Sequence, residues 1–328
     1  MGPDTRLGTA PAPERLRCHN RGTVPTLLAS LILMQPLTVG KFQPIYDPAL
    51  GEKEPWCLND HCFIKGPDAQ WHLFGITHVK PFNFAEDPGR NLAHATAKTL
   101  TQNPWKKEPF AVTIDPAKYN EHLFWAPHIV RDKGLYHMFV CAGAKEGHKY
   151  AIHRLVSTDL RKWQRAVNNP VLVDGFDARD PMVIRDGSKW ILYYTANSTQ
   201  EGGNHIVASV TSKDLIKWSD RKVVFTHPRE GTFAGPTESP FVVRRGKLYY
   251  LFITDNDVVH VYQSGDPYKW SPDDHVYEYR GHACEVVRDE KGDWFVSHVG
   301  WMSGGLELAP ITWNDGMDKE SSSLEKAS

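Results

Sequence analysis

Three carboxylic acids lie at the leading ends of similar short apolar segments that are far apart in the chain. Asp60 precedes His-Cys-Phe-Ile, Asp180 precedes Pro-Met-Val-Ile, and Glu238 precedes Ser-Pro-Phe-Val-Val. Two or three carboxylates around one pocket are the groups that hydrolyse glycosidic bonds, because one can donate a proton while another activates water or attacks the sugar. A neighbouring carboxylate raises the pKa of the one that must stay protonated. The sequence therefore predicts catalysis if the fold brings these ends together.

The acids belong to an internal repeat. A Ser-x-Asp-Leu-x-x-Trp motif and its weaker copies end at Trp105, Trp163, Trp218 and Trp270. Between them stand five pairs of segments, each an apolar stretch, a charged or glycine turn and an aromatic-rich stretch. The pairs begin at Asp60, Ala126, Asp180, Ser239 and Ala283. Since β-branched and aromatic residues flank each turn, every pair is typical of a β-hairpin.

Five copies of a unit about 50 residues long predict an all-β fold, a five-bladed β-propeller. No apolar period of 3.6 residues and useful length is present, which excludes a helical solenoid. The innermost strand of each blade lines the axial funnel, so the leading residues of the five segments are expected at its mouth. On this interpretation the three acids occupy equivalent starting positions in blades one, three and four, and the recurring tryptophans are blade core.

Composition restricts the partners and the cysteine chemistry. The 328 residues carry 38 basic and 39 acidic side chains without a basic run, which argues against a nucleic-acid partner. The apolar run at 24–34 is too short to span a bilayer. The five cysteines lack zinc spacing. Cys57 and Cys62 either form a local disulfide or, as we favour, are buried free thiols.

Four further side chains flank the leading ends and are candidate substrate-binding residues: Trp125, His128, Arg179 and His282. Trp125 either stacks on a sugar ring or packs between blades. Arg179 holds a neighbouring carboxylate or a sugar hydroxyl, or forms a purely structural ion pair. On an alternating strand His128 can point either way. For His282 we expect a polar role at the axis. Calcium or another cation could bind there, but a single histidine is not a metal motif.

Over roughly residues 41–316 the chain resembles the five-bladed propeller glycosidases of glycoside hydrolase families 43 and 62, with relatives in families 32 and 68. The Trp-Ala-Pro sequence that starts at Trp125 is similar to a family 43 motif. Gly281-His282 is similar to the Gly-His pair of that family's last blade, where the histidine lies near the axis and often close to a metal or water.

Family 43 implies a role for each acid. Asp60 falls on the general base, Asp180 on the residue that tunes pKa and holds the substrate, and Glu238 on the general acid. The resemblance implies an inverting hydrolase that cleaves furanoside or pentoside linkages of an oligo- or polysaccharide, of the α-L-arabinofuranosidase, arabinanase or β-xylosidase type. Such hydrolysis requires no organic cofactor.

Two alternatives remain open. Residues 179–181 match the Arg-Asp-Pro motif of family 32 fructosidases, and residues 56–60 are similar to their Trp-x-Asn-Asp-Pro opening, with His61 in place of the proline. Ser239 stands where that family has a cysteine, and the chain leaves no room for that family's usual second domain. A retaining β-fructofuranosidase with Asp60 as nucleophile is one alternative. The other is a propeller that binds carbohydrate without turnover.

The two ends of the chain differ from the repeat region. Residues 1–40 contain basic residues, then an apolar run, then small residues at 38–40, which resembles a secretory signal. An unstructured extension is the alternative. We expect the catalytic propeller at residues 41–316 and a polar disordered tail at residues 317–328. The signal-like start favours a secreted or periplasmic protein over a cytoplasmic one.

Overall fold

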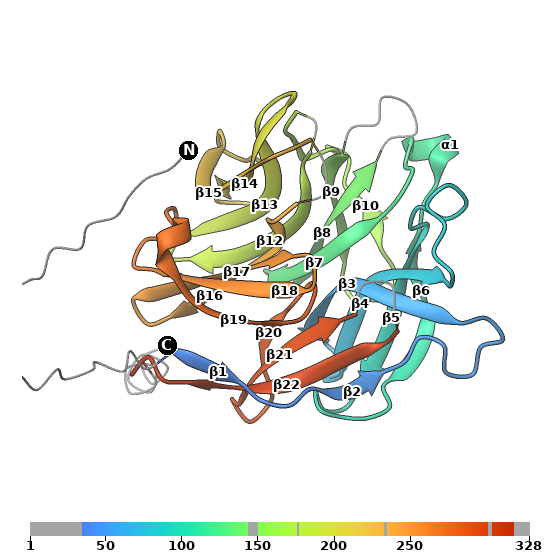
Figure 1. Cartoon of the computed structure of the whole chain (residues 1–328). Coiled ribbons are helices and arrows are strands. Elements are labelled where there is room, and N and C mark those ends of the chain that lie inside the picture. Colours follow the sequence, from blue (N-terminus) through green and yellow to red (C-terminus); the bar gives the residue numbers. More distant parts are fainter. Residues whose placement is uncertain (1–34, 144–149, 176, 233–234, 301–303, 318–328) are drawn as a thin grey trace, which may run out of the picture. The chain divides into compact units, whose positions relative to one another are not determined.

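The computed structural model describes residues 35–317, except for 144–149, 176, 233–234 and 301–303. In this part of the chain five antiparallel sheets form a ring (Figure 1), the five-bladed β-propeller that the repeat predicts. The described helices are α1 (Pro116–Tyr119) and the 3-10 helix η1 (Pro272–Asp274). No helix among the described residues is long and apolar enough to cross a membrane.

Blades one to four each use consecutive strands that begin at the axis and end at the outer edge. Blade one contains β3 (Trp56–Lys65), β4 (Trp71–Val79), β5 (Asn91–Ala97) and β6 (Lys106–Thr113). Blade two contains β7 (Trp125–Asp132), β8 (Leu135–Gly143), β9 (Tyr150–Ser157), β10 (Gln164–Arg165) and β11 (Leu172–Val173). Blade three contains β12 (Arg179–Asp186), β13 (Lys189–Thr199), β14 (Gly202–Ser212) and β15 (Lys222–Glu230). Blade four contains β16 (Glu238–Arg245), β17 (Leu248–Asp255), β18 (Val258–Ser264) and β19 (His275–Arg280).

Blade five joins the two ends of the propeller. Its inner strands are β20 (Val286–Arg288), β21 (Trp294–Val299) and β22 (Leu306–Trp313), and its outer strands are β1 (Leu37–Val39) and β2 (Gln43–Tyr46). Both outer strands pair with β22. In the pairing of β1 with β22, Leu37 lies opposite Trp313. The propeller therefore begins before residue 41, where the sequence placed its start. A three-residue strand is too short to show a period of its own, and only its partner reveals it.

The hydrophobic core lies between neighbouring blades. One apolar cluster joins blades one and two, a second joins blades two and three, a third joins blades three, four and five, and a fourth joins blades five and one. The motif tryptophans pack in these clusters, as the repeat predicted: Trp105, Trp163, Trp218 and Trp270. Burial of aromatic surface between blades thus stabilises the ring that positions the funnel.

The Ser-x-Asp-Leu-x-x-Trp motif is a turn that its own side chains cap. The Ser212 hydroxyl accepts hydrogen bonds from the backbone N–H groups of Asp214 and Leu215, at 3.1 and 2.9 Å. Asp214 Oδ1 then accepts the next two backbone N–H groups at 2.9 Å each. Leu215 has a left-handed φ of 62° and is fully buried. The motif therefore buries a leucine side chain in the blade core at the point where the backbone changes direction.

The four cysteines within the described residues are free and buried. Cys57 and Cys62 lie on the same strand, β3, where five residues of extended chain separate their Cα atoms by about 16 Å. That separation excludes a disulfide between them, because bridged Cα atoms lie within about 7 Å. Of the two expectations, buried free thiols are confirmed for this pair.

Candidate active site

The innermost strands of blades one, three and four carry the three acids at their funnel ends. In each strand one early residue pairs with a threonine of the next strand: Leu58 with Thr77, Arg179 with Thr195, and Glu238 with Thr254. The ladder then skips two residues before pairing resumes. Counted from this common point, Glu238 is the first residue, Asp180 the second and Asp60 the third. The sequence placed the acids at equivalent positions, which is wrong, because the bulge in each strand can only be located from the pairing.

The bulge explains why successive side chains reach one pocket. Asp180 and Ser239 have left-handed φ values of 53° and 49°, and Ala126 adopts the same conformation in blade two, at 46°. A non-glycine residue with positive φ stores backbone strain, which is concentrated at functional sites. In a regular strand, neighbouring side chains point to opposite faces. The left-handed residue turns Arg179 and Asp180 toward the same group of carboxylates.

Arg179 is the centre of this group. Its Nε donates to both carboxylate oxygens of Asp177, at 3.0 and 3.1 Å. Its Nη1 donates to Asp180 Oδ2 at 3.2 Å and to Glu238 Oε1 at 3.1 Å. The side chains of Arg179 and Asp177 are 5% and 0% exposed, so solvent screens these ion pairs little. One guanidinium therefore fixes the relative positions of two predicted catalytic acids from different blades.

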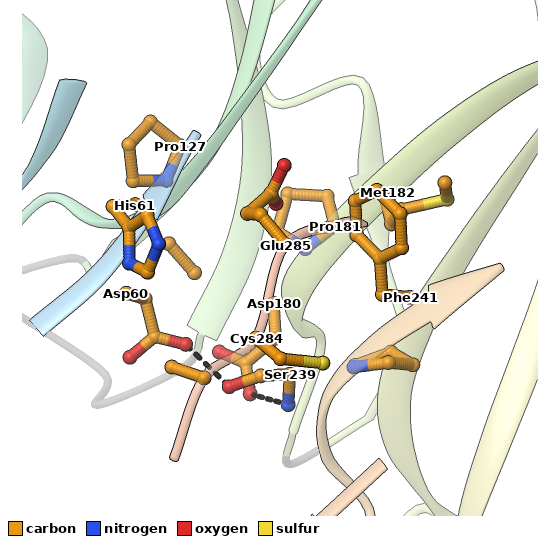
Figure 2. Close-up of a pocket in the computed structure, with 13 residues that line it drawn as sticks. Asp60, His61, Pro127, Asp180, Pro181, Met182, Ser239, Phe241, Cys284 and Glu285 are labelled. Atoms are coloured by element: carbon orange, nitrogen blue, oxygen red, sulfur yellow. Dashed lines mark hydrogen bonds between the residues drawn. The ribbon is translucent and has the colours of Figure 1, made fainter. Parts of the chain in front are cut away.

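A second link joins Asp60 to Asp180 through Ser239. The Ser239 hydroxyl donates a short hydrogen bond to Asp60 Oδ1, and the Ser239 backbone N–H donates to Asp180 Oδ2 at 3.0 Å (Figure 2). Together with the Arg179 contacts, these bonds connect all three acids. The structure therefore brings together the residues Asp60, Asp180 and Glu238 that the sequence selected.

The group shifts the protonation of its members. Burial and the nearby Asp180 carboxylate raise the pKa of Asp60 to about 6, although His282 and the Ser239 hydroxyl oppose the rise. Burial also raises the pKa of Asp177 to about 6 against the effect of Arg179. Burial alone would lower the pKa of Arg179, but the surrounding carboxylates hold it well above its usual value. Asp60 can thus gain or lose a proton near neutral pH, as acid–base catalysis requires.

A small cavity lies beside the acids on the axis of the propeller. It is bordered by Asp60, Asp180 and Glu285 (Figure 2). Its volume of about 20 Å³ is enough for one water molecule. Glu285 Oε1 lies 3.6 Å from His128 Nδ1, and His128 Nε2 lies 3.1 Å from the Val183 carbonyl oxygen. Burial raises the pKa of Glu285, and His128 opposes the rise. His128 thus contacts a residue that lines the cavity, and its role in binding a sugar stays a prediction.

Trp125 forms an aromatic wall at the funnel end of blade two. Its ring stacks on Tyr150 with centroids 5.4 Å apart and meets Phe84 edge-on at 5.8 Å, while its Nε1 donates to the Pro88 carbonyl at 2.6 Å. The residue is half-buried. Burial raises the pKa of Tyr150 to about 12. Such a wall suits stacking against a sugar ring.

His282 precedes Ala283, which lines the cavity, and its polar role at the axis stays a prediction. His282 is buried, its Nδ1 lies 3.0 Å from the Asn256 carbonyl oxygen, and it lowers the pKa of Asp60. Calcium takes six to eight oxygen ligands. Among the described residues, the one convergence of three His, Cys, Asp or Glu ligand atoms lies in blade four, at His260, His275 and Glu278, and not at the axis. Among the described residues no such cluster of three side-chain ligand atoms includes His282, and a cation there stays a prediction.

Sequence reasoning missed four residues of this site: Asp177, Tyr150, Ser239 and Glu285. Asp177 and Ser239 each lie within two residues of a predicted acid or of Arg179, so proximity to a bulged strand start was an available signal. Glu285 is a charged residue inside an apolar segment, Ala-Cys-Glu-Val-Val, which indicates a paired buried charge. Tyr150 had no such signal, since only folding places it against Trp125.

Comparison with known proteins agrees with this geometry. The model for glycosyl hydrolases family 43 matches residues 90–317, more than half of the chain. The chain belongs to glycoside hydrolase family 43. No curated protein matches this family 43 chain in sequence.

Solved structures share the propeller of this family 43 enzyme. An endo-arabinase from Bacteroides thetaiotaomicron is 17% identical over 79% of this chain and 96% of its own, with a TM-score of 0.63. A family 43 β-xylosidase/α-arabinofuranosidase from a compost microbial metagenome is 15% identical over 84% and 94%, with a TM-score of 0.60. A family 32 β-fructofuranosidase from Bombyx mori is 14% identical over 84% of this chain but 61% of its own, with a TM-score of 0.58. At these identities the likeness shows a common fold.

Proposed function

We propose that this glycoside hydrolase cleaves furanoside or pentoside linkages of an oligo- or polysaccharide with inversion at the anomeric carbon. The observation that carries the proposal is the Arg179 guanidinium, which binds Asp180 and Glu238 from separate blades, with Asp60 joined to them through Ser239. A binding site alone needs no linked group of three carboxylates. The names of two similar family 43 structures, an endo-arabinase and a β-xylosidase/α-arabinofuranosidase, support the substrate class.

In the proposed reaction Glu238 donates its proton to the glycosidic oxygen as the bond to the anomeric carbon breaks. Asp60 removes a proton from a water molecule, and the oxygen of that water bonds to the anomeric carbon from the opposite face. Arg179 stabilises the Glu238 carboxylate that remains after proton transfer. Asp180 anchors the sugar and holds Ser239 and Arg179 in place. The proton that Asp60 gains then returns to Glu238 through solvent.

No step of this scheme uses a cofactor. One similar family 43 structure is described as a calcium-free form in complex with xylotriose. In this chain the proposed role of His282 is to support the ionised form of Asp60, whose pKa it lowers.

We also propose that the enzyme acts outside the cytoplasm, in the periplasm or after secretion. The support is the basic and then apolar order of the residues before Leu37. Cleavage at the small residues 38–40 would remove β1 and open blade five. A signal peptide must therefore be cut before Leu37. N-terminal sequencing of the exported protein should find a start before this residue, and retention of the uncut chain in the cytoplasm would contradict the proposal.

The test is hydrolysis of aryl α-L-arabinofuranoside, aryl β-xyloside, arabinan and sucrose by the native chain, Glu238→Gln and Glu307→Gln. Glu307 is a half-exposed glutamate of blade five that lies 3.2 Å from a histidine, so its variant controls for loss of a paired carboxylate. NMR follows the anomer that is released first. We expect turnover of a furanoside or pentoside with inverted product and at least a 100-fold loss in Glu238→Gln alone.

Other outcomes would change the assignment. A retained anomer, or turnover of sucrose alone, would make Asp60 a nucleophile and the enzyme fructosidase-like. Sugar binding of equal affinity in all three proteins without turnover would identify a carbohydrate-binding propeller instead.

A further inference from the structure

Three side chains on the outer part of blade four point metal-ligand atoms at one another. His260 Nδ1 lies 3.4 Å from His275 Nε2 and 3.3 Å from Glu278 Oε2, and the last two atoms are 3.6 Å apart. His260 is partly buried and the other two residues are exposed. This cluster has no part in the proposed hydrolysis, because it lies on β18 and β19, away from the innermost strands that carry the acids (Figure 1).

The strand pairing produces this convergence. His260 of β18 lies directly opposite Glu278 of β19, so their side chains share one face of the blade. A bulge between Val261 and Tyr262 shifts the register, and His275 at the start of β19 pairs with Tyr262. The His260 and His275 rings come to rest with centroids 5.4 Å apart. The strand pairing therefore places the three side chains next to one another.

We propose that His260, His275 and Glu278 form a zinc-binding site with a fourth position left for water. Zinc is held tetrahedrally by imidazole nitrogen and carboxylate oxygen at about 2.0–2.1 Å, so two such ligand atoms lie about 3.3–3.4 Å apart. The three separations of 3.3, 3.4 and 3.6 Å match this spacing. Octahedral ligands at the same bond length would lie about 2.9 Å apart. Calcium has longer bonds but takes oxygen ligands, and two imidazoles therefore favour zinc.

Zinc at this site would join the two outermost strands of blade four. Among the described strands β19 pairs with β18 alone, and all three ligands belong to these two strands. A ligand that binds the folded chain and not the unfolded chain raises the melting temperature by mass action. The site is thus a structural clip at a sheet edge, and its effects can be measured whether or not the chain hydrolyses a sugar.

The test titrates metal-free full-length protein with zinc chloride by calorimetry and compares His275→Gln, Glu278→Gln and Glu307→Gln. Glu307 pairs across strands with His298 at 3.2 Å, as Glu278 does with His260, but has no second histidine, so it is the matched control. We expect one zinc ion that is lost or weakened at least tenfold in His275→Gln and Glu278→Gln and unchanged in Glu307→Gln. Equal zinc affinity in native protein and His275→Gln would overturn the proposal.

Two further measurements are independent of affinity. Zinc should raise the melting temperature of the native protein by a few degrees. Calcium chloride added to the native protein should not raise it, and neither should zinc added to His275→Gln. Cobalt chloride should give the intense visible absorption of tetrahedral cobalt in the native protein. A weak, octahedral-type spectrum, or the same intense spectrum in His275→Gln, would contradict the geometry.

Discussion

At the scale of single residues, the proposed mechanism makes the pKa of Asp60 the determinant of the acid side of the pH profile. A general base must be ionised, and the pKa of Asp60 lies at about 6. We therefore expect kcat/KM to fall as the pH drops below about 6, because Asp60 becomes protonated there. The Ser239 hydroxyl donates to the Asp60 carboxylate and so favours its ionised form.

Removal of that hydroxyl should move the acid limb. In Ser239→Ala we expect the acid limb of the kcat/KM profile to shift upward by about one pH unit, since the ionised form loses a charge-assisted hydrogen bond. Alanine fits the left-handed backbone, because Ala126 and Ala283 adopt φ values of 46° and 50° at similar sites in blades two and five. Ser239→Cys keeps a weak donor and should give a smaller shift. An acid limb that does not move in Ser239→Ala would contradict this account.

Arg179 should be irreplaceable by lysine. An ammonium group lacks the planar fork with which Arg179 reaches Asp177, Asp180 and Glu238 at once. We expect Arg179→Lys to lower kcat about 100-fold, with a smaller change in KM, because misplaced acids slow the reaction more than they weaken binding. Arg185→Lys is the control, since this exposed arginine of the same strand donates to the Gly187 carbonyl. A kcat unchanged in Arg179→Lys would refute a positioning role.

At the scale of elements, the capped turn of the repeat should contribute to stability and not to chemistry. Asp214 accepts two backbone N–H groups that have no other partner in the turn. Asp214→Ala should therefore cost about 1 kcal/mol, or about 2 °C in melting temperature, with kcat unchanged. Asp220 is a nearby exposed residue, and Asp220→Ala should have the same melting temperature as the native protein. Calorimetry measures both, and equal melting of the two variants would show that the turn does not need this cap.

The same scale separates what the sequence predicts from what it does not. Strands, hairpins and blade number follow from local alternation and from the repeat, because each copy buries its aromatic stretch in the same way. The acids themselves could be selected, since charges at the ends of apolar segments are informative. The relative register of the acids could not be predicted, because a bulge is defined by pairing with the partner strand. The Arg179 clamp and the Trp125–Tyr150 wall join segments from different parts of the fold, and no local pattern encodes such contacts.

At the scale of the whole molecule, the funnel depends on a closed ring. Asp60 stands in blade one and Glu238 in blade four, and blade five lies between them on the short way around. The first and last parts of the described chain meet in that blade, where β1 completes the sheet of β20, β21 and β22. Any loosening there should change the distance between Asp60 and Glu238, and we therefore expect stability and activity to be coupled through blade five.

Leu37 allows this coupling to be tested. It is fully buried in β1 and packs in the cluster that joins blades three, four and five. Leu37→Ala should reduce the free energy of unfolding by about 2–5 kcal/mol, because it leaves a cavity where the ring closes. Thr38 is its exposed neighbour on the same strand, so Thr38→Ala keeps the backbone pairing and should cost less than about 0.5 kcal/mol.

Activity should follow stability in this pair. As temperature rises, Leu37→Ala should lose kcat below the temperature at which bulk strand structure melts, since blade five opens before the other blades separate. Thr38→Ala should lose kcat and strand structure at the same temperature. Hydrogen exchange of the β22 amides measures the opening directly, and it should be faster in Leu37→Ala while exchange in β13 stays slow. Equal acceleration in β13 and β22 would mean that the propeller unfolds as one unit and that closure by β1 is no weaker than the rest of the ring.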